Sequence, residues 1–110
     1  MRLKDDGLST DGPLEDKAWT PWQYPKDWVV EMFAPEGPKL FRRGEWFYLI
    51  SAVGGTAGPP TSHMVTVARS RSVHGPWQDA PNNPVVRTQS IHEPWWSRGH
   101  ASVVEGPAGD

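Results

Sequence analysis

The 110-residue chain contains no cysteine. A disulfide framework, a thiolate metal site and a cysteine nucleophile are therefore excluded. No apolar run approaches the roughly 20 residues that a membrane-spanning helix needs, so no membrane partner is expected. Eleven Lys and Arg stand against thirteen Asp and Glu, and this balance lacks the basic excess typical of proteins that bind nucleic acid. The first residues carry no apolar stretch typical of a secretory signal, and the sequence assigns no localisation.

Glycine and proline, by contrast, are abundant, with 11 and 12 residues respectively. The longest stretch free of both spans residues 61–74, and it is rich in Val and Thr, which favour strands. Such short windows leave little room for helices of average length. The spacing therefore predicts an all-β chain of short strands, and the 12.3 kDa chain is large enough for one small core.

Four strands are expected in succession. The apolar runs at 39–41 and 46–50 flank a loop that contains glycine, and this pattern predicts a β-hairpin. Residues 64–68 are expected to form a third strand, and a short fourth strand follows the turn at 75–77. Four antiparallel strands of this kind form one blade of a β-propeller.

A short internal repeat indicates how the blade lies in the chain. The tripeptide Glu-Gly-Pro at 36–38 recurs at 105–107, each time just before a turn. We expect residues 35–98 to form one blade with its outgoing connection, and residues 99–110 to hold the first strand of the next blade. Residues 1–34 are expected to be an irregular connection from a preceding blade. Because a blade needs neighbours to bury its faces, the chain is interpreted as a fragment of a larger propeller.

Glu36 is the first candidate for chemistry. Two prolines and a glycine surround it, and their backbone preferences would hold the carboxylate in one place. Such a placement suits a catalytic acid. The alternative is a turn carboxylate in solvent.

The histidines give one further candidate. His100 lies at the start of an expected strand, and in a propeller the first strands line the central channel. There the imidazole could contact a ligand or a metal, and the alternative is a hydrogen-bonded structural histidine. His63, His74 and His92 show no metal-ligand spacing and are expected on the surface or in loops. No metal site is predicted.

The glycine-rich loop at 54–60 lacks the Gly-Lys-Ser/Thr of a phosphate-binding loop, so that role is not assigned to it. We expect the loop to rim a pocket instead. Trp95 and Trp96 are candidates for a pocket edge, where their flat faces could stack on sugar rings. Trp46 and Trp77 are expected to pack in the core.

In their order along the chain, these motifs resemble glycoside hydrolase family 43. The motifs are PEGPKL at 35–40, GEWFYLI at 44–50, GGT at 54–56, VTVARS at 65–70, GPW at 75–77, NPV at 83–85 and GHA at 99–101. Their ordered succession over residues 35–110 is more specific than any one of them.

The resemblance implies a five-bladed β-propeller that hydrolyses oligosaccharides or side chains of plant polysaccharides, typically as a β-xylosidase or α-L-arabinofuranosidase. The family inverts the anomeric configuration with a general base, a general acid and an aspartate that tunes the acid. Glu36 matches the general acid through its Glu-Gly-Pro motif. His100 matches a histidine near the base of the pocket, and Gly55 and Thr56 match the bordering loop. Together with Trp96, these three residues form the expected substrate-binding set.

The resemblance implies no organic cofactor, and a calcium ion near the histidine is compatible with the full-length propeller. The chain departs from the family pattern at Val53, where an acidic residue is common, and in its aspartates. No aspartate within residues 1–34 sits in a matching motif, although an inverting site needs a second carboxylate roughly 6.5–9.5 Å from the acid. The sequence thus predicts a partial glycoside hydrolase that carries the general acid. The alternatives are a non-catalytic carbohydrate-binding fragment and a purely structural pair of blades.

Overall fold

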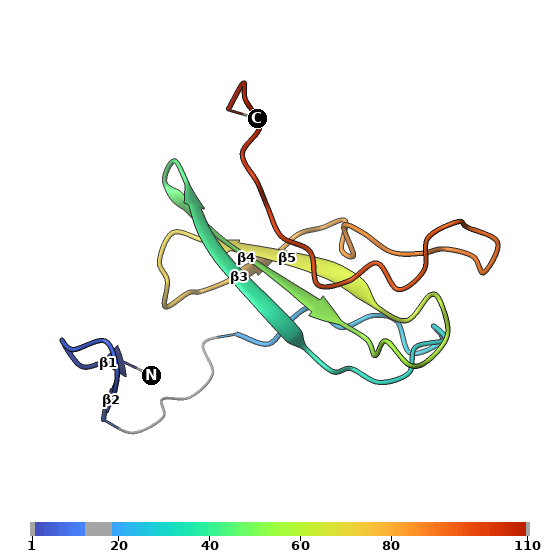
Figure 1. The fold of residues 1–110 in the computed structure, drawn as a ribbon, viewed down its shortest axis with the longest axis horizontal. Coiled ribbons are helices and arrows are strands. Elements are labelled where there is room, and N and C mark those ends of the chain that lie inside the picture. Colours follow the sequence, from blue (N-terminus) through green and yellow to red (C-terminus); the bar gives the residue numbers. More distant parts are fainter. Residues whose placement is uncertain (1, 13–18, 110) are drawn as a thin grey trace.

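The computed structural model describes residues 2–12 and 19–109. All regular secondary structure in these residues is β-strand, which confirms the all-β prediction. A small two-stranded sheet pairs β1 (Arg2–Leu3) with β2 (Thr10–Asp11), and a four-stranded sheet follows (Figure 1). Within the described ranges, no helix is long and apolar enough to cross a membrane.

The four-stranded sheet contains β3 (Glu36–Arg43), β4 (Trp46–Val53), β5 (Met64–Ser70) and β6 (Gln78–Asp79). The strands lie in chain order and each is antiparallel to the next. This is the arrangement of one propeller blade. The predicted hairpin and the third and fourth strands are therefore confirmed.

The core of the sheet lies on its two central strands, β4 and β5. Its buried apolar residues are Ile50, Ala52, Val53, Met64, Val65 and Ala68. Two buried hydroxyls, Ser51 Oγ and Thr66 Oγ1, lie 3.2 Å apart across these strands and satisfy each other. The edge strand β3 alternates exposed and half-buried residues over most of its length, as expected for a strand with one covered face.

The start of β3 contains a β-bulge. Glu36 pairs with Ala52 and Lys39 pairs with Ile50, so β3 has one extra residue in this interval. Gly37 within the bulge has φ +57°, a left-handed conformation that glycine adopts at little cost. Because a bulge bends its strand and re-aims a side chain, this irregularity sets the direction of Glu36.

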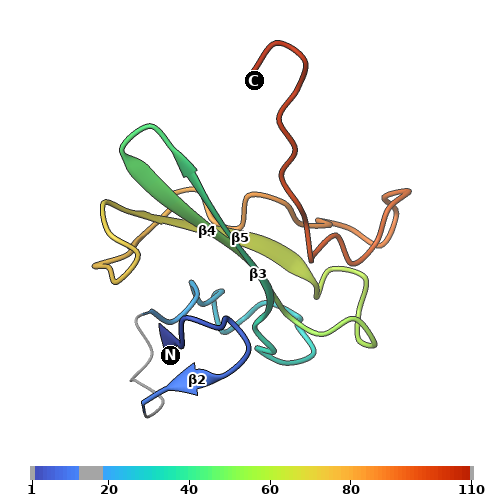
Figure 2. The ribbon, with the colours of Figure 1, turned by 60° about the vertical axis from the view of Figure 1, so that its left-hand side comes forward.

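The chain returns after β6 to the end of the sheet where β3 begins. Arg98 forms an ion pair with Glu93 in the returning segment, and the N–H of Ser97 donates to the carbonyl of Pro60 at 2.9 Å. In Figures 1 and 2, the start of β3, the β4–β5 loop and the returning segment gather at the end opposite the β3–β4 turn. His100 follows this segment directly.

Two tryptophans predicted in the core lie at its margin instead. Trp46 is half-buried, with the guanidinium groups of Arg69 and Arg71 at 4.4 and 4.3 Å from its ring centroid. Trp77 is also half-buried and packs against Trp19 at a centroid distance of 6.4 Å. The prediction was wrong because non-aromatic side chains, Met64 and Val53 among them, fill the buried centre.

The division of the chain into a connection (1–34), one blade (35–98) and the first strand of the next blade (99–110) stays a prediction. Some of these residues lie outside the described ones. Residues 101–104 have no strand partner in the part of the chain that the structure describes, so no strand is assigned there. The radius of gyration is 15.9 Å. A compact domain of this length would have a radius of about 13 Å, so a considerable part of the chain extends away from the blade.

Candidate active site

Glu36 lies at the rim of a shallow pocket of about 220 Å³. The pocket is lined by Glu31, Met32, Ala34, Glu36, Gly54, Gly55, Thr56 and Ala57. The β4–β5 loop thus forms one wall, and the segment that leads into β3 forms the other. The structure brings Glu36 together with Gly55 and Thr56, the two loop residues that the family resemblance indicated.

Two imidazole rings contact one oxygen of the Glu36 carboxylate. Nδ1 of His100 lies 3.3 Å from Oε1, and Nε2 of His63 lies 3.4 Å from the same atom. The Glu36 side chain is 49% exposed and that of His100 is 52% exposed, whereas that of His63 is only 3% exposed. Among the described residues, no group hydrogen-bonds to Oε2 of Glu36.

His63, predicted on the surface or in a loop, lies in the loop directly before β5, but not on the surface. Its ring is buried, and Nδ1 lies 2.5 Å from the carbonyl oxygen of Gly54. A signal was available in the sequence. His63 directly precedes the predicted strand at 64–68, and antiparallel pairing of that strand with 46–50 places its start at the end of the sheet where Glu36 lies.

Two glycines allow both rings to approach Glu36. A Cβ on Gly37 would lie 2.6 Å from the His100 ring, and a Cβ on Gly99 would lie 2.0 Å from the His63 ring. His100 itself has φ +53° and Ala34 has φ +34°. Positive φ in non-glycine residues costs about 1–3 kcal/mol each and clusters at functional sites.

Glu31 is a second carboxylate at the pocket, and the sequence analysis missed it. Its Oε2 accepts hydrogen bonds from the N–H groups of Ala57 at 3.1 Å and Gly58 at 2.9 Å. Its own N–H donates to the Ser62 hydroxyl at 2.9 Å. Glu31 therefore fixes the loop wall of the pocket. No local pattern in the sequence signals these contacts, because they depend on the path of the loop.

Trp96 does not line this pocket. Its side chain is 60% exposed, and its Nε1–H donates to the carbonyl of Glu93 at 3.0 Å. The substrate-binding roles of Trp96, His100, Gly55 and Thr56 stay predictions.

The described residues hold no group of three or more His, Asp or Glu side chains that could bind a metal ion. Calcium takes six to eight oxygen ligands. These residues by themselves do not fit a calcium ion, and the expectation for the full-length propeller stays a prediction.

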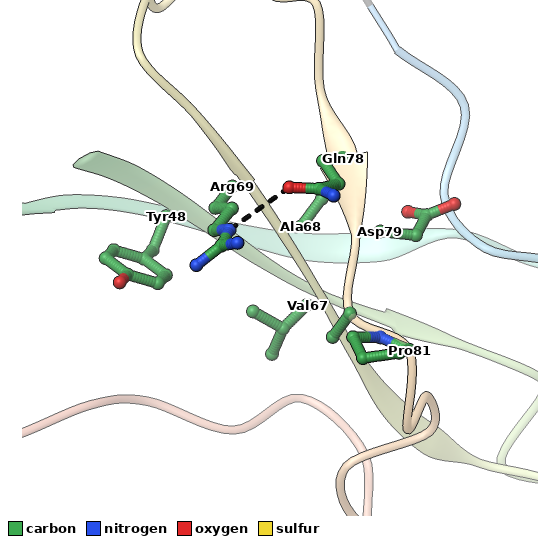
Figure 3. Close-up of a pocket in the computed structure, with 8 residues that line it drawn as sticks. Tyr48, Val67, Ala68, Arg69, Gln78, Asp79 and Pro81 are labelled. Carbon is green, nitrogen blue, oxygen red and sulfur yellow. Dashed lines mark hydrogen bonds between the residues drawn. The ribbon is translucent and has the colours of Figure 1, made fainter.

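A larger hollow of about 410 Å³ lies over β5 and β6, and Figure 3 shows its lining. Three of its polar side chains, Arg69, Gln78 and Asp79, hydrogen-bond to each other or to a neighbour. Arg69 Nε donates to Gln78 Oε1 at 3.2 Å, and Trp19 Nε1 donates to Asp79 Oδ1 at 3.2 Å. It has no carboxylate held by histidines, and the pocket at Glu36 is the better candidate for catalysis.

Comparison with known proteins identifies the family. Residues 1–110 match the sequence model of the glycosyl hydrolases family 43. The chain belongs to this family. A xylan 1,3-beta-xylosidase from a Vibrio species is 37% identical over 82 residues, which cover 74% of this chain and 15% of that protein. Xylosidase/arabinosidase 43B from Humicola insolens is 36% identical over 75 residues, which cover 67% of this chain and 13% of that protein.

A solved structure of the same family has the same fold. The crystal structure of a mutant of the GH43 protein BlXynB from Bacillus licheniformis matches with a TM-score of 0.74 and 31% identity. The match covers 97% of this chain and 19% of that one. The family resemblance drawn from the motifs is confirmed. This family 43 chain spans only a small part of the length of its relatives.

Proposed function

We propose that this family 43 chain carries the general acid of a glycoside hydrolase that acts on xylose- or arabinose-containing oligosaccharides from plant polysaccharides. The substrate class is supported by the relatives, one named as a xylosidase and one as a xylosidase/arabinosidase. The observation that carries the proposal is the geometry of Glu36. Its carboxylate lies at a pocket, with histidines on Oε1 and no hydrogen-bond partner for Oε2 among the described residues.

In an inverting hydrolysis, a carboxylic acid protonates the leaving glycosidic oxygen while water attacks the anomeric carbon from the opposite face. We assign the acid to Glu36. Its proton passes to the glycosidic oxygen, the bond from that oxygen to the anomeric carbon breaks, and the water oxygen bonds to this carbon. The general base that takes the proton of the water is not assigned within these 110 residues, since the carboxylate of Glu31 holds the loop.

The sugar is expected to lie between the β4–β5 loop and Glu36. Gly55 and Thr56 line the pocket there, and the half-exposed His100 contacts the acid directly. Trp96 is assigned to an outer contact with the sugar chain, and its 60% exposure supports a stacking surface.

The test uses a family 43 polypeptide that contains these 110 residues and has the full length of the relatives. We call it the full-length polypeptide. The variant to be measured is Glu36→Gln. Gln keeps the size and hydrogen bonding of the side chain but has no transferable proton. On natural linkages, kcat should fall by about 10²–10⁴. Aryl glycosides with acidic phenols need little protonation and should lose much less. Glu45→Gln, which changes an exposed carboxylate at the β3–β4 turn, is the matched control.

An equal loss on both substrate types, or no loss on either, would remove Glu36 from the acid role. The non-catalytic carbohydrate-binding interpretation would then lead, supported by Trp95 and Trp96, which are 72% and 60% exposed. Binding of xylo-oligosaccharides by calorimetry, lost in a Trp95→Ala and Trp96→Ala double variant, would establish it.

A further inference from the structure

The ring nitrogen Nε2 of His63 is buried and has no hydrogen-bond partner in the described part of the chain. The other ring nitrogen, Nδ1, lies 2.5 Å from the carbonyl oxygen of Gly54. A carbonyl oxygen only accepts hydrogen bonds, so Nδ1 carries a hydrogen. Nε2 is therefore the atom left to interact with another group.

The Glu36 carboxylate lies beside Nε2, with Oε1 at 3.4 Å. This distance exceeds that of a good hydrogen bond. Catalytic contacts are often long in the absence of substrate and shorten when substrate binds. A buried polar atom without a partner is rare in folded proteins and calls for an explanation, and a contact completed during turnover provides one.

The ring is also confined in its position. Gly99 packs against it so closely that a Cβ on that residue would lie 2.0 Å from the ring. With the Gly54 carbonyl on Nδ1 and the Gly99 backbone against the ring, His63 can hardly turn. Nε2 is thus a fixed point beside Oε1.

We propose that His63 is a positioning residue for Glu36. With hydrogens on both ring nitrogens, its Nε2 donates to Oε1, and Oε2 is left as the oxygen that carries the proton and delivers it to the leaving group. His100 contacts Oε1 from a half-exposed position, whereas His63 acts from the buried side. This inference rests on the proposed role of Glu36 as the general acid.

Two substitutions in the full-length polypeptide distinguish the contribution of Nδ1 from that of Nε2. In His63→Asn, the amide takes the place of Nδ1 and keeps the bond to Gly54 but loses the contact with Glu36. In His63→Gln, the longer amide reaches the place of Nε2 and gives up the bond to Gly54. Both are measured beside Glu36→Gln, on natural linkages and on aryl glycosides with acidic phenols, with melting temperatures as a check of folding.

We expect His63→Asn to lower kcat on natural linkages by about 10–100-fold with KM nearly unchanged, since a small misplacement of a catalytic group has effects of this size. The loss on aryl glycosides with acidic phenols should be much smaller. His63→Gln should stay within a few-fold of the parent. If His63→Asn does not fold, Gly99→Ala, which displaces the intact ring, should give the same dependence on the leaving group.

The reverse order, with His63→Asn active and His63→Gln impaired, would show that only the bond to Gly54 matters and would overturn the inference. An equal loss on both substrate types in His63→Asn would also overturn it. If Glu36→Gln shows the dependence on the leaving group and His63→Asn does not, only the inference fails. If Glu36→Gln lacks this dependence, the proposed function fails, and the inference fails with it.

Discussion

Gly37, the residue directly after Glu36, meets two separate requirements in the bulge of β3. Its φ of +57° lies in the left-handed region, and a side chain there would also strike the His100 ring at 2.6 Å. Gly44, in the β3–β4 turn, has a nearly equal φ of +59° but nothing within 4 Å of an added Cβ. The two glycines therefore separate backbone strain from the contact with His100.

Gly44→Ala should cost only the backbone strain, about 1–2 kcal/mol, and should leave kcat unchanged. Gly37→Ala should cost more stability and also lower kcat by tenfold or more, because the added methyl group displaces His100 from Glu36. Chemical denaturation and steady-state kinetics of the full-length polypeptide measure both effects. Equal effects of the two substitutions would show that the approach of His100 to Gly37 is unimportant.

At the scale of elements, the β4–β5 loop is held to the rest of the chain by Glu31. Glu31→Ala removes the acceptor for the amides of Ala57 and Gly58. Hydrogen exchange at these two amides should become about tenfold faster, corresponding to the loss of ~1.4 kcal/mol of hydrogen bonding to a charged group. KM should rise because the loop borders the pocket, whereas the dependence of kcat on the leaving group should persist.

Glu45→Ala is the control for the loop, since its carboxylate pairs with Arg71 at the other end of the sheet. It should leave the exchange of the loop amides unchanged. Unchanged exchange in Glu31→Ala as well would mean that the loop keeps its shape without this carboxylate.

The elements of the blade were predictable because each depends on local sequence. Apolar and β-branched runs between glycine turns gave the strands at 39–41, 46–50 and 64–68, which are all present. The side chains that meet at the end of the sheet were harder to predict. The positions of His63 and Glu31 depend on strand register, on the bulge in β3 and on the path of a loop, and a shift of one residue would turn every side chain to the other face.

Trp46 shows the same limit. A large aromatic residue at the start of an apolar run favours a core position. The pairing of β4 with β5, however, brings Arg69 and Arg71 onto its ring. Motif order predicted the family, and the family resemblance led to Glu36, Gly55 and Thr56 as site residues. The contacts of the buried His63 needed the three-dimensional structure.

For the molecule as a whole, many large apolar side chains remain exposed. Leu40 is 54% exposed, Trp95 72%, Val103 54% and Val104 85%. A single blade buries too little of its surface to be stable without neighbours, and unpaired strands and apolar patches promote association.

The isolated 110-residue chain should therefore self-associate and show a broad thermal transition. A double substitution, Val103→Lys with Val104→Lys, should reduce the association because it places charges on the unpaired segment. Size-exclusion chromatography with light scattering and calorimetry test both statements. A sharp, cooperative melt of a monomer would contradict them.

The distance between the two ends of the sheet has a practical consequence. Glu36 begins β3 and Gly44 lies just after its last residue, Arg43. Eight residues at about 3.3 Å per residue place this turn roughly 25 Å from the carboxylate. Figure 1 shows the β3–β4 turn projecting at the far end of the hairpin. A fluorophore or an affinity peptide inserted at this turn would give the full-length polypeptide a handle for immobilisation or single-molecule observation at a site far from the proposed acid.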